Sequence, residues 1–212
     1  MTNQYPTDFF RRIDDSDDEL FYSMPRLVVH IDEAAIERVG QIYAESLPAG
    51  GTILDLMSSW RSHLPVKLRP TRVVGLGLSR PEMDDNPALT ERVVHNLNRN
   101  PRLPFDDSTF DGAVVTVSIQ YMTRPVEVFA DVGRVLKPGA PFIVTFSNRM
   151  FPTKAVAVWR ALSDRDRMQL VGKYFVDSAA FEKVQMIDRR AISYPTTDPV
   201  FAVLGFRKRE IA

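Results

Sequence analysis

Apolar residues occur along the chain in short, nearly continuous runs bounded by glycine, proline and other turn-forming residues. Five such runs predict strands at residues 52–56, 72–76, 91–95, 110–117 and 141–146. Apolar character at successive positions, rather than at alternate ones, is typical of strands covered on both faces. The pattern therefore indicates a mostly parallel sheet at the centre of the molecule.

Segments with helical spacing of apolar residues alternate with these strands. They predict helices at residues 32–47, 125–136 and 163–175. Asp32 is placed to cap the first helix, and the Lys137-Pro138-Gly139 turn ends the second. This alternation predicts a doubly wound, Rossmann-like α/β fold with helices on both faces of the sheet, joined by right-handed crossovers.

The C-terminal region predicts two further strands, at residues 181–187 and 200–206. The segment between them includes residues 195–199, a short Pro-Thr-Thr-Asp-Pro stretch without helical periodicity. A connection without a crossover helix makes the last pair antiparallel. Since neither repeats nor linkers are visible, we expect one domain over residues 1–212.

Charge and composition narrow the classes of partner. The chain has 27 basic and 27 acidic residues, so its formal net charge is zero. This argues against a broad electrostatic partner such as duplex nucleic acid or an anionic membrane. The chain has no cysteine and no apolar run long enough to span a bilayer. With no secretory signal in residues 1–12, we expect a cytoplasmic protein.

Metal binding is not expected. The three histidines, His30, His63 and His95, lie far apart in the sequence and lack the paired spacing of metal ligands. The acidic cluster at residues 14–19 is interpreted as a solvated or helix-capping segment.

Ligands of open α/β sheets bind beyond the carboxyl ends of the strands. That rule selects four short segments as candidate site loops. They are residues 55–63, 77–82, 96–98 and 118–121.

Four motifs stand in order around these loops. They are ILDL at 53–56, VVGLGLS at 73–79, LPFDDSTFD at 103–111 and RVLKPG at 134–139. Together they resemble the class I S-adenosylmethionine-dependent methyltransferases of the type 11 kind, over residues 52–148. The resemblance implies a seven-stranded sheet of order 3-2-1-4-5-7-6 with an antiparallel last strand.

The resemblance also implies S-adenosylmethionine as the cofactor and assigns roles to individual residues. Asp55 matches the acidic residue that opens the cofactor loop, and Gly77 stands where the family has an acid for the ribose hydroxyls. Asn96 matches the residue that recognises the adenine amino group, while Ser118 matches the segment that faces the sulfonium and the substrate. The expected cofactor contacts are Asp55, Leu56, Met57, Ser58, Gly77, Leu78, Asn96, Leu97 and Ser118.

The cofactor loop departs from the family pattern. The family places three glycines after the acid, and here those positions hold Met57, Ser59 and Arg61. Glycine there gives an open backbone and close approach to the ligand, so these side chains must point away or narrow the pocket. A degenerate methyltransferase fold that binds a ligand or protein partner is therefore the alternative. A nicotinamide-dependent reductase would need a glycine-rich turn that this loop lacks.

Acceptor and catalytic candidates come from two regions. We expect residues 1–31 to cover the pocket and to contribute Tyr22, Arg26 and His30. Gln120 and Tyr121 follow the fourth strand and Asn148 ends the fifth. The expected substrate contacts are Tyr22, Arg26, Gln120 and Asn148. His30 or Tyr121 is the expected general base for a small acceptor that must lose a proton.

Overall fold

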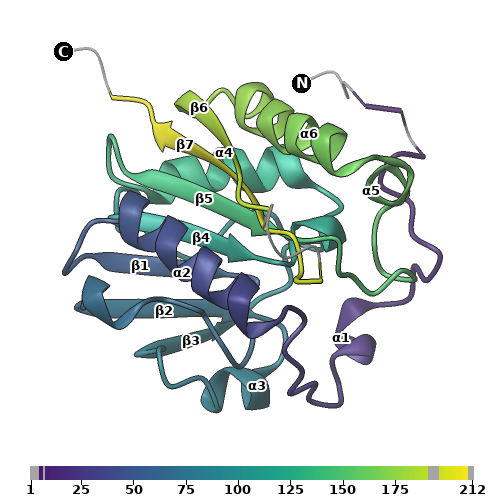
Figure 1. Cartoon of the computed structure of the whole chain (residues 1–212), viewed down its shortest axis with the longest axis horizontal. Helices are drawn as coiled ribbons and strands as arrows, with labels where there is room; N and C mark the ends of the chain where they lie inside the picture. Colours follow the sequence, from purple (N-terminus) through teal and green to yellow (C-terminus); the bar gives the residue numbers. More distant parts are fainter. Residues whose placement is uncertain (1–4, 7, 191–195, 210–212) are drawn as a thin grey trace.

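A computed structural model describes residues 5–6, 8–190 and 196–209 of the chain. Its centre is a seven-stranded sheet of order β3-β2-β1-β4-β5-β7-β6 (Figure 1). The strands are β1 Thr52–Leu56, β2 Arg72–Gly77, β3 Glu91–Val94, β4 Gly112–Thr116, β5 Pro141–Phe146, β6 Phe181–Asp188 and β7 Phe201–Arg207. The order predicted from the sequence is confirmed.

Strand direction also follows the prediction. Strands β1 to β5 pair in parallel, and β7 runs antiparallel to both of its neighbours, β5 and β6. The predicted connection at residues 195–199 includes Pro195, which lies outside the described residues.

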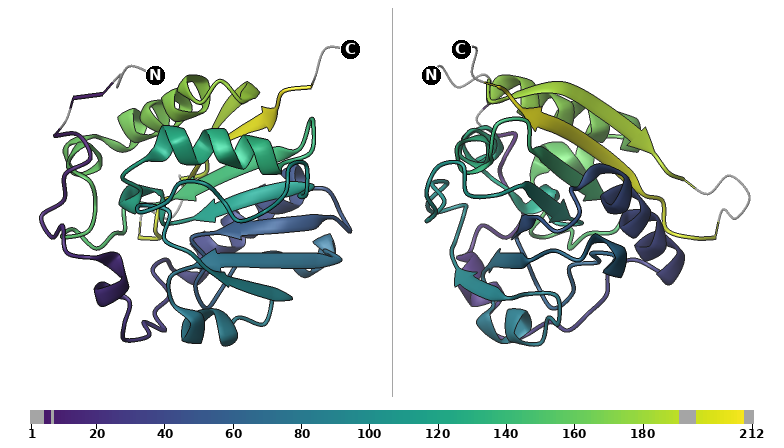
Figure 2. Two further views of the ribbon diagram at one scale, coloured as in Figure 1. Left: turned by 180° about the vertical axis from the view of Figure 1, so that it is seen from behind. Right: turned by 90° about the vertical axis from the view of Figure 1, so that its left-hand side faces the viewer.

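Helices cover both faces of the sheet, as expected. The helices are α1 Asp18–Phe21, α2 Glu33–Ser46, α3 Arg80–Asp84, α4 Pro125–Val135, α5 Ala157–Ala161 and α6 Asp164–Asp177, with 3-10 turns η1 Val66–Leu68 and η2 Ile119–Tyr121. Helix α2 lies in front of the sheet in Figure 1 and α4 behind it, and Figure 2 shows α4 from the other side.

Alternate residues of the strands supply the two apolar layers. Ile53 and Val114 pack with α2, whereas Leu54 and Val115 pack with α4 and α6. Such burial on both faces stabilises the sheet by about 1.5–3 kcal/mol for each large side chain removed from water.

The crossover from β1 to β2 departs from regular α/β geometry. Residues 57–71 contain η1 but no α-helix. Two causes are visible: Pro65 and Pro70 restrict the backbone, and the Ser58 N–H bonds to the Leu76 carbonyl oxygen at 2.8 Å instead of entering a helix. Trp60 lies in this stretch without an α-helix. Its Nε1 donates to the Val28 carbonyl oxygen at 3.0 Å.

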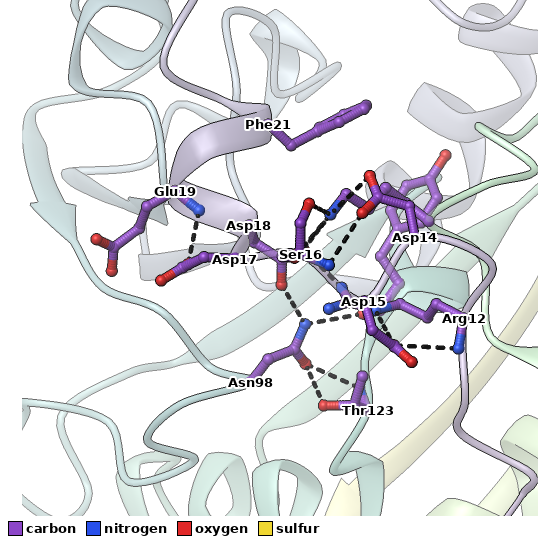
Figure 3. A network of polar contacts seen from close by, with 12 residues as sticks. Arg12, Asp14, Asp15, Ser16, Asp17, Asp18, Glu19, Phe21, Asn98 and Thr123 are labelled. Atoms are coloured by element: carbon purple, nitrogen blue, oxygen red, sulfur yellow. Dashed lines mark hydrogen bonds and ion pairs between the residues drawn. The ribbon is translucent and has the colours of Figure 1, made fainter.

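The N-terminal segment is fastened to the body by a polar network (Figure 3). Asp18 is 6% exposed and accepts a hydrogen bond from Asn98 Nδ2 at 2.9 Å and ion-pairs with Arg12. Lys154, 2% exposed, donates to the Ser16 carbonyl oxygen and pairs with Asp14 at 3.2 Å. The interpretation of residues 14–19 as solvated or capping is therefore wrong for Asp18, whose partners come from distant parts of the sequence.

Candidate functional site

A pocket lies at the carboxyl ends of β1, β2 and β4, where the sequence places the ligand. Loops from the strand ends form one wall, and the N-terminal segment forms another. The lining residues include Tyr22, Arg26, His30, Asp55, Met57, Ser58, Gly77, Leu78, Glu82, Leu97, Ser118, Tyr121 and Phe151. Residues 22–31 of the N-terminal segment therefore lie over the ends of these strands.

Asp55 is the last polar group of β1 and is 2% exposed. Its Oδ2 accepts hydrogen bonds from Ser58 Oγ at 2.7 Å and from Ser62 Oγ at 2.6 Å. Burial raises the pKa of the Asp55 carboxyl to about 6, and the two serine hydroxyls partly oppose that shift. Asp55 thereby fixes the shape of the loop that follows it.

The first of the three family glycine positions keeps a glycine-like backbone although it holds methionine. Met57 has φ +57°, in the left-handed region that glycine adopts easily, and its side chain packs against the core beside the pocket. Arg61 stacks on the Trp60 ring at 4.0 Å and donates to the Asp85 carbonyl oxygen at 2.9 Å. The Met57 and Arg61 side chains are thus held by protein contacts.

Gly77 ends β2 and is covered by the loop. A Cβ at this position would lie 2.2 Å from the Ser58 carbonyl oxygen, far inside van der Waals contact. No side chain fits there, so the acid usual at the end of β2 is sterically excluded.

Glu82 supplies a carboxylate beside the same strand end. It is 2% exposed, lines the pocket, and accepts hydrogen bonds from Ser59 Oγ at 2.6 Å and from the Arg26 N–H at 2.8 Å. Sequence reasoning missed it, although a signal was present: Ser79 caps α3 and Glu82 stands three residues later, at capping-box spacing.

Four predicted contacts are not brought to the pocket. Asn96 is turned away because its Oδ1 accepts from the Asn98 and Arg99 N–H groups. Leu56 is fully buried in the core, and Gln120 bonds to the Val117 carbonyl oxygen at 3.0 Å. Asn148 is exposed beyond β5. Local hydrogen bonds and core packing decide these positions, and neither is visible in the motif.

Ser118 lies at the end of β4, inside the pocket. Its Oγ is buried without a hydrogen-bond partner among the described residues. The preceding Val117 has φ +49°, a strained conformation for a β-branched residue. Strain and an unsatisfied hydroxyl at one strand end are features of ligand sites.

Aromatic side chains form the outer end of the pocket. The Phe151 ring lies 4.8 Å from His30 and 6.1 Å from Tyr121, measured between centroids. Tyr121 Oη accepts the Phe151 N–H at 2.7 Å, which leaves its own proton free to donate. Tyr22 also lines this end.

Burial sets the protonation of these groups. It lowers the pKa of His30 below its usual range, while the nearby Glu82 charge partly raises it. Desolvation raises the pKa of the Tyr121 and Tyr22 hydroxyls. At neutral pH the pocket therefore holds a neutral imidazole and two protonated phenols.

The described residues contain no group of three or more His, Cys, Asp or Glu side chains placed to hold a metal ion. None of the described helices is long and apolar enough to cross a membrane.

Comparison with known proteins gives three kinds of match. Residues 61–144 match the family model described as "Methyltransferase domain". The demethylmenaquinone methyltransferase of Lactiplantibacillus plantarum is 24% identical over 172 residues, covering 76% of this chain and 72% of that protein. The biotin biosynthesis bifunctional protein BioHC of Teredinibacter turnerae is 23% identical over 116 residues. The match covers 55% of this chain but only 20% of BioHC's length.

Solved structures share the fold at low identity. The structure described as the [4+2]-cyclase SpnF has a TM-score of 0.63 and 15% identity, covering 87% of this chain and 88% of that one. A SAM-dependent methyltransferase from Aquifex aeolicus has a TM-score of 0.57 and 16% identity, covering 83% and 98%.

The sheet order, with a pocket at the ends of β1, β2 and β4, defines the class I methyltransferase fold. Within that fold, residues 61–144 match the methyltransferase domain model, so the chain resembles the S-adenosylmethionine-dependent methyltransferases of the type 11 kind.

Proposed function

We propose that this protein transfers a methyl group from S-adenosylmethionine to a small-molecule acceptor bound in the pocket described above. The observation that carries the proposal is the pairing of two buried carboxylates, Asp55 and Glu82, with the unsatisfied Ser118 hydroxyl in that pocket. Zero net charge and the absence of cysteine favour a cytoplasmic protein that does not act on nucleic acid.

The cofactor half of the pocket fits a nucleoside with an amino-acid tail. Glu82 would accept hydrogen bonds from the ribose hydroxyls, because Gly77 carries no acid and Glu82 is the carboxylate at that strand end. Leu78 and Leu97 would flank the adenine, and Ser118 would bond to the polar tail. S-adenosylmethionine supplies an electrophilic methyl group on a sulfonium and leaves as S-adenosylhomocysteine.

The acceptor half lies under the N-terminal segment. His30, neutral at pH 7, would take the proton that the acceptor loses, and Tyr121 would donate a hydrogen bond that orients it. Tyr22 and Arg26 would close the pocket against water. Positioning and exclusion of water are the main tasks here, because the methyl donor is already reactive.

A second candidate function is ligand binding without methyl transfer. Two observations favour it: the loop lies across the end of β2, and the fold is shared with a protein described as a [4+2]-cyclase. Fold alone therefore does not fix methyl transfer.

Calorimetric titration with S-adenosylmethionine and S-adenosylhomocysteine tests the proposal. Saturable binding of both ligands supports the methyltransferase. Absence of binding of either at millimolar concentration would sink it and favour the second candidate.

A further inference from the structure

The N-terminal segment exposes large apolar side chains at the mouth of the pocket. Met24, Leu27, Val28 and Val29 are 76%, 51%, 54% and 41% exposed. We call these four residues the apolar rim. The four residues lie within six positions of one segment. Apolar side chains exposed together, rather than singly, mark binding regions.

The apolar rim is continuous with the pocket. Val28 and Val29 line the pocket as well as facing solvent. The Val28 carbonyl oxygen accepts the Trp60 indole N–H, which fixes the rim against the loop after β1. A molecule seated in the pocket can therefore continue onto the rim.

The interior that the rim leads into has aromatic walls. Phe151 contacts the rings of His30, Tyr121 and Phe21, and the Arg26 guanidinium lies 4.0 Å from the Phe21 ring centroid. Flat rings pack well against such walls.

Charge near the rim argues against a bilayer as its occupant. On the same segment, the exposed carboxylates Asp17 and Glu19 pair with Arg99 at 3.9 and 3.0 Å, and Arg26 is the one basic residue within residues 24–29. Peripheral membrane segments carry clustered lysine and arginine instead, since the lipid surface is anionic. The rim therefore suits part of a small molecule better than a lipid surface.

We propose that the acceptor is an amphiphile whose aromatic ring occupies the Phe151 end of the pocket and whose alkyl tail lies on the apolar rim. This inference rests on the proposed function, which makes the Phe151 end of the pocket the acceptor site. It names the class of acceptor: an aromatic compound with an alkyl substituent.

A series of 4-alkylphenols, from phenol to 4-hexylphenol, tests the proposal by calorimetry on the full chain. Each added methylene that leaves water should tighten binding by at most about fourfold, so we expect a two- to fourfold fall in Kd per methylene. In the double variant Met24→Ser/Leu27→Ser the dependence on chain length should flatten, while phenol itself binds as before, because neither residue lines the pocket.

Val94→Ser is the matched control, because Val94 is 54% exposed, close to the 51% of Leu27, but lies in β3 away from the pocket lining. It should keep the full dependence. The proposal would be overturned if Kd depended on alkyl chain length equally in the wild type and the double variant, or if none of the phenols bound. Sedimentation of the wild type, but not of the double variant, with phosphatidylcholine vesicles would assign the rim to a lipid surface instead.

S-adenosylhomocysteine binding is measured in parallel and separates the two proposals. If the wild type shows the chain-length dependence but does not bind S-adenosylhomocysteine, the rim still binds alkyl chains while methyl transfer fails. If the wild type and the double variant bind S-adenosylhomocysteine alike, a weaker dependence of Kd on alkyl chain length in the double variant results from the changed rim residues.

Discussion

The Ser58 carbonyl oxygen lies 2.2 Å from where a Cβ on Gly77 would stand. This relationship links the two departures from the family's cofactor site. Without its glycines the loop after β1 runs beside β2, and that path leaves room only for glycine at the strand end. In the proposed cofactor site, the carboxylate would come from Glu82 in the next helix, α3.

Gly77→Ala should therefore destabilise the protein by about 2–3 kcal/mol, because the loop backbone must shift to admit the methyl group. Gly40→Ala is the control: its Cβ would lie 3.8 Å from the nearest atom, inside α2. There, alanine should be neutral or stabilise by up to about 1 kcal/mol. Urea unfolding measures both variants, and a Gly77→Ala protein as stable as the wild type would contradict the steric account.

Glu82→Gln should weaken S-adenosylhomocysteine binding about tenfold or more, since a charged acceptor of hydrogen bonds is lost. Asp84→Asn in the same helix is the control, because Asp84 is exposed and outside the pocket lining. Calorimetry should show less than a twofold change for Asp84→Asn. Equal Kd values for the two variants would remove Glu82 from the cofactor site.

Asp55→Asn should change how stability depends on pH. The raised pKa of Asp55, about 6 in the folded protein, means that ionisation is costly there but not in the unfolded chain. Asp55 therefore destabilises the folded state as pH rises from about 4 to about 6. Over that range the free energy of unfolding of Asp55→Asn should rise by about 1–3 kcal/mol relative to that of the wild type. Above about pH 6 the difference between the two proteins should stay constant.

Urea unfolding at pH 4.5, 5.5 and 7.5 measures this difference. A relative stability that does not vary with pH would mean that Asp55 titrates in its ordinary range when folded.

Lys154→Met should loosen the N-terminal segment, because it leaves Asp14 without its buried partner and removes one from Asp18. Breaking a buried ion pair costs about 3–5 kcal/mol. We expect the free energy of unfolding, measured in urea, to fall by about that amount. Trypsin should also cleave faster after Arg12 and Arg26. Lys137→Met, at an exposed pair with Asp111, should cost about 1 kcal/mol or less. Similar losses in both variants would deny the anchoring role.

His30 should titrate below 6.5, since burial lowers its pKa. Proton NMR of the imidazole signals, with His30→Asn for assignment, measures the midpoint. In Glu82→Gln the midpoint should fall further, because the Glu82 charge favours the protonated form. A midpoint at or above 6.5 would contradict the effect of burial, and one well above 7 would leave His30 mostly charged at neutral pH and unsuited to accept a proton.

Local patterns were enough to predict most of the fold. The apolar run at residues 141–146, set off by the Pro138-Gly139 turn, matches β5 at both ends. The capping-box spacing of Ser79 and Glu82 gives a local signal for Glu82 at the start of α3. Its place in the pocket depends on the path of residues 57–59 across β2, which no local pattern predicts. The anchoring of Asp18 also rests on partners more than 75 residues away, Asn98 and Lys154. Motif matching placed Asn96 in the pocket, whereas its own turn holds it away.

A crystal structure of the protein with S-adenosylhomocysteine tests the central claim most directly. The account predicts a nucleoside in the pocket, with its ribose hydroxyls on Glu82, its adenine against Leu97 and its tail near Ser118. Crystals grown at saturating ligand with the pocket empty, or with the nucleoside bound away from Glu82, would contradict it.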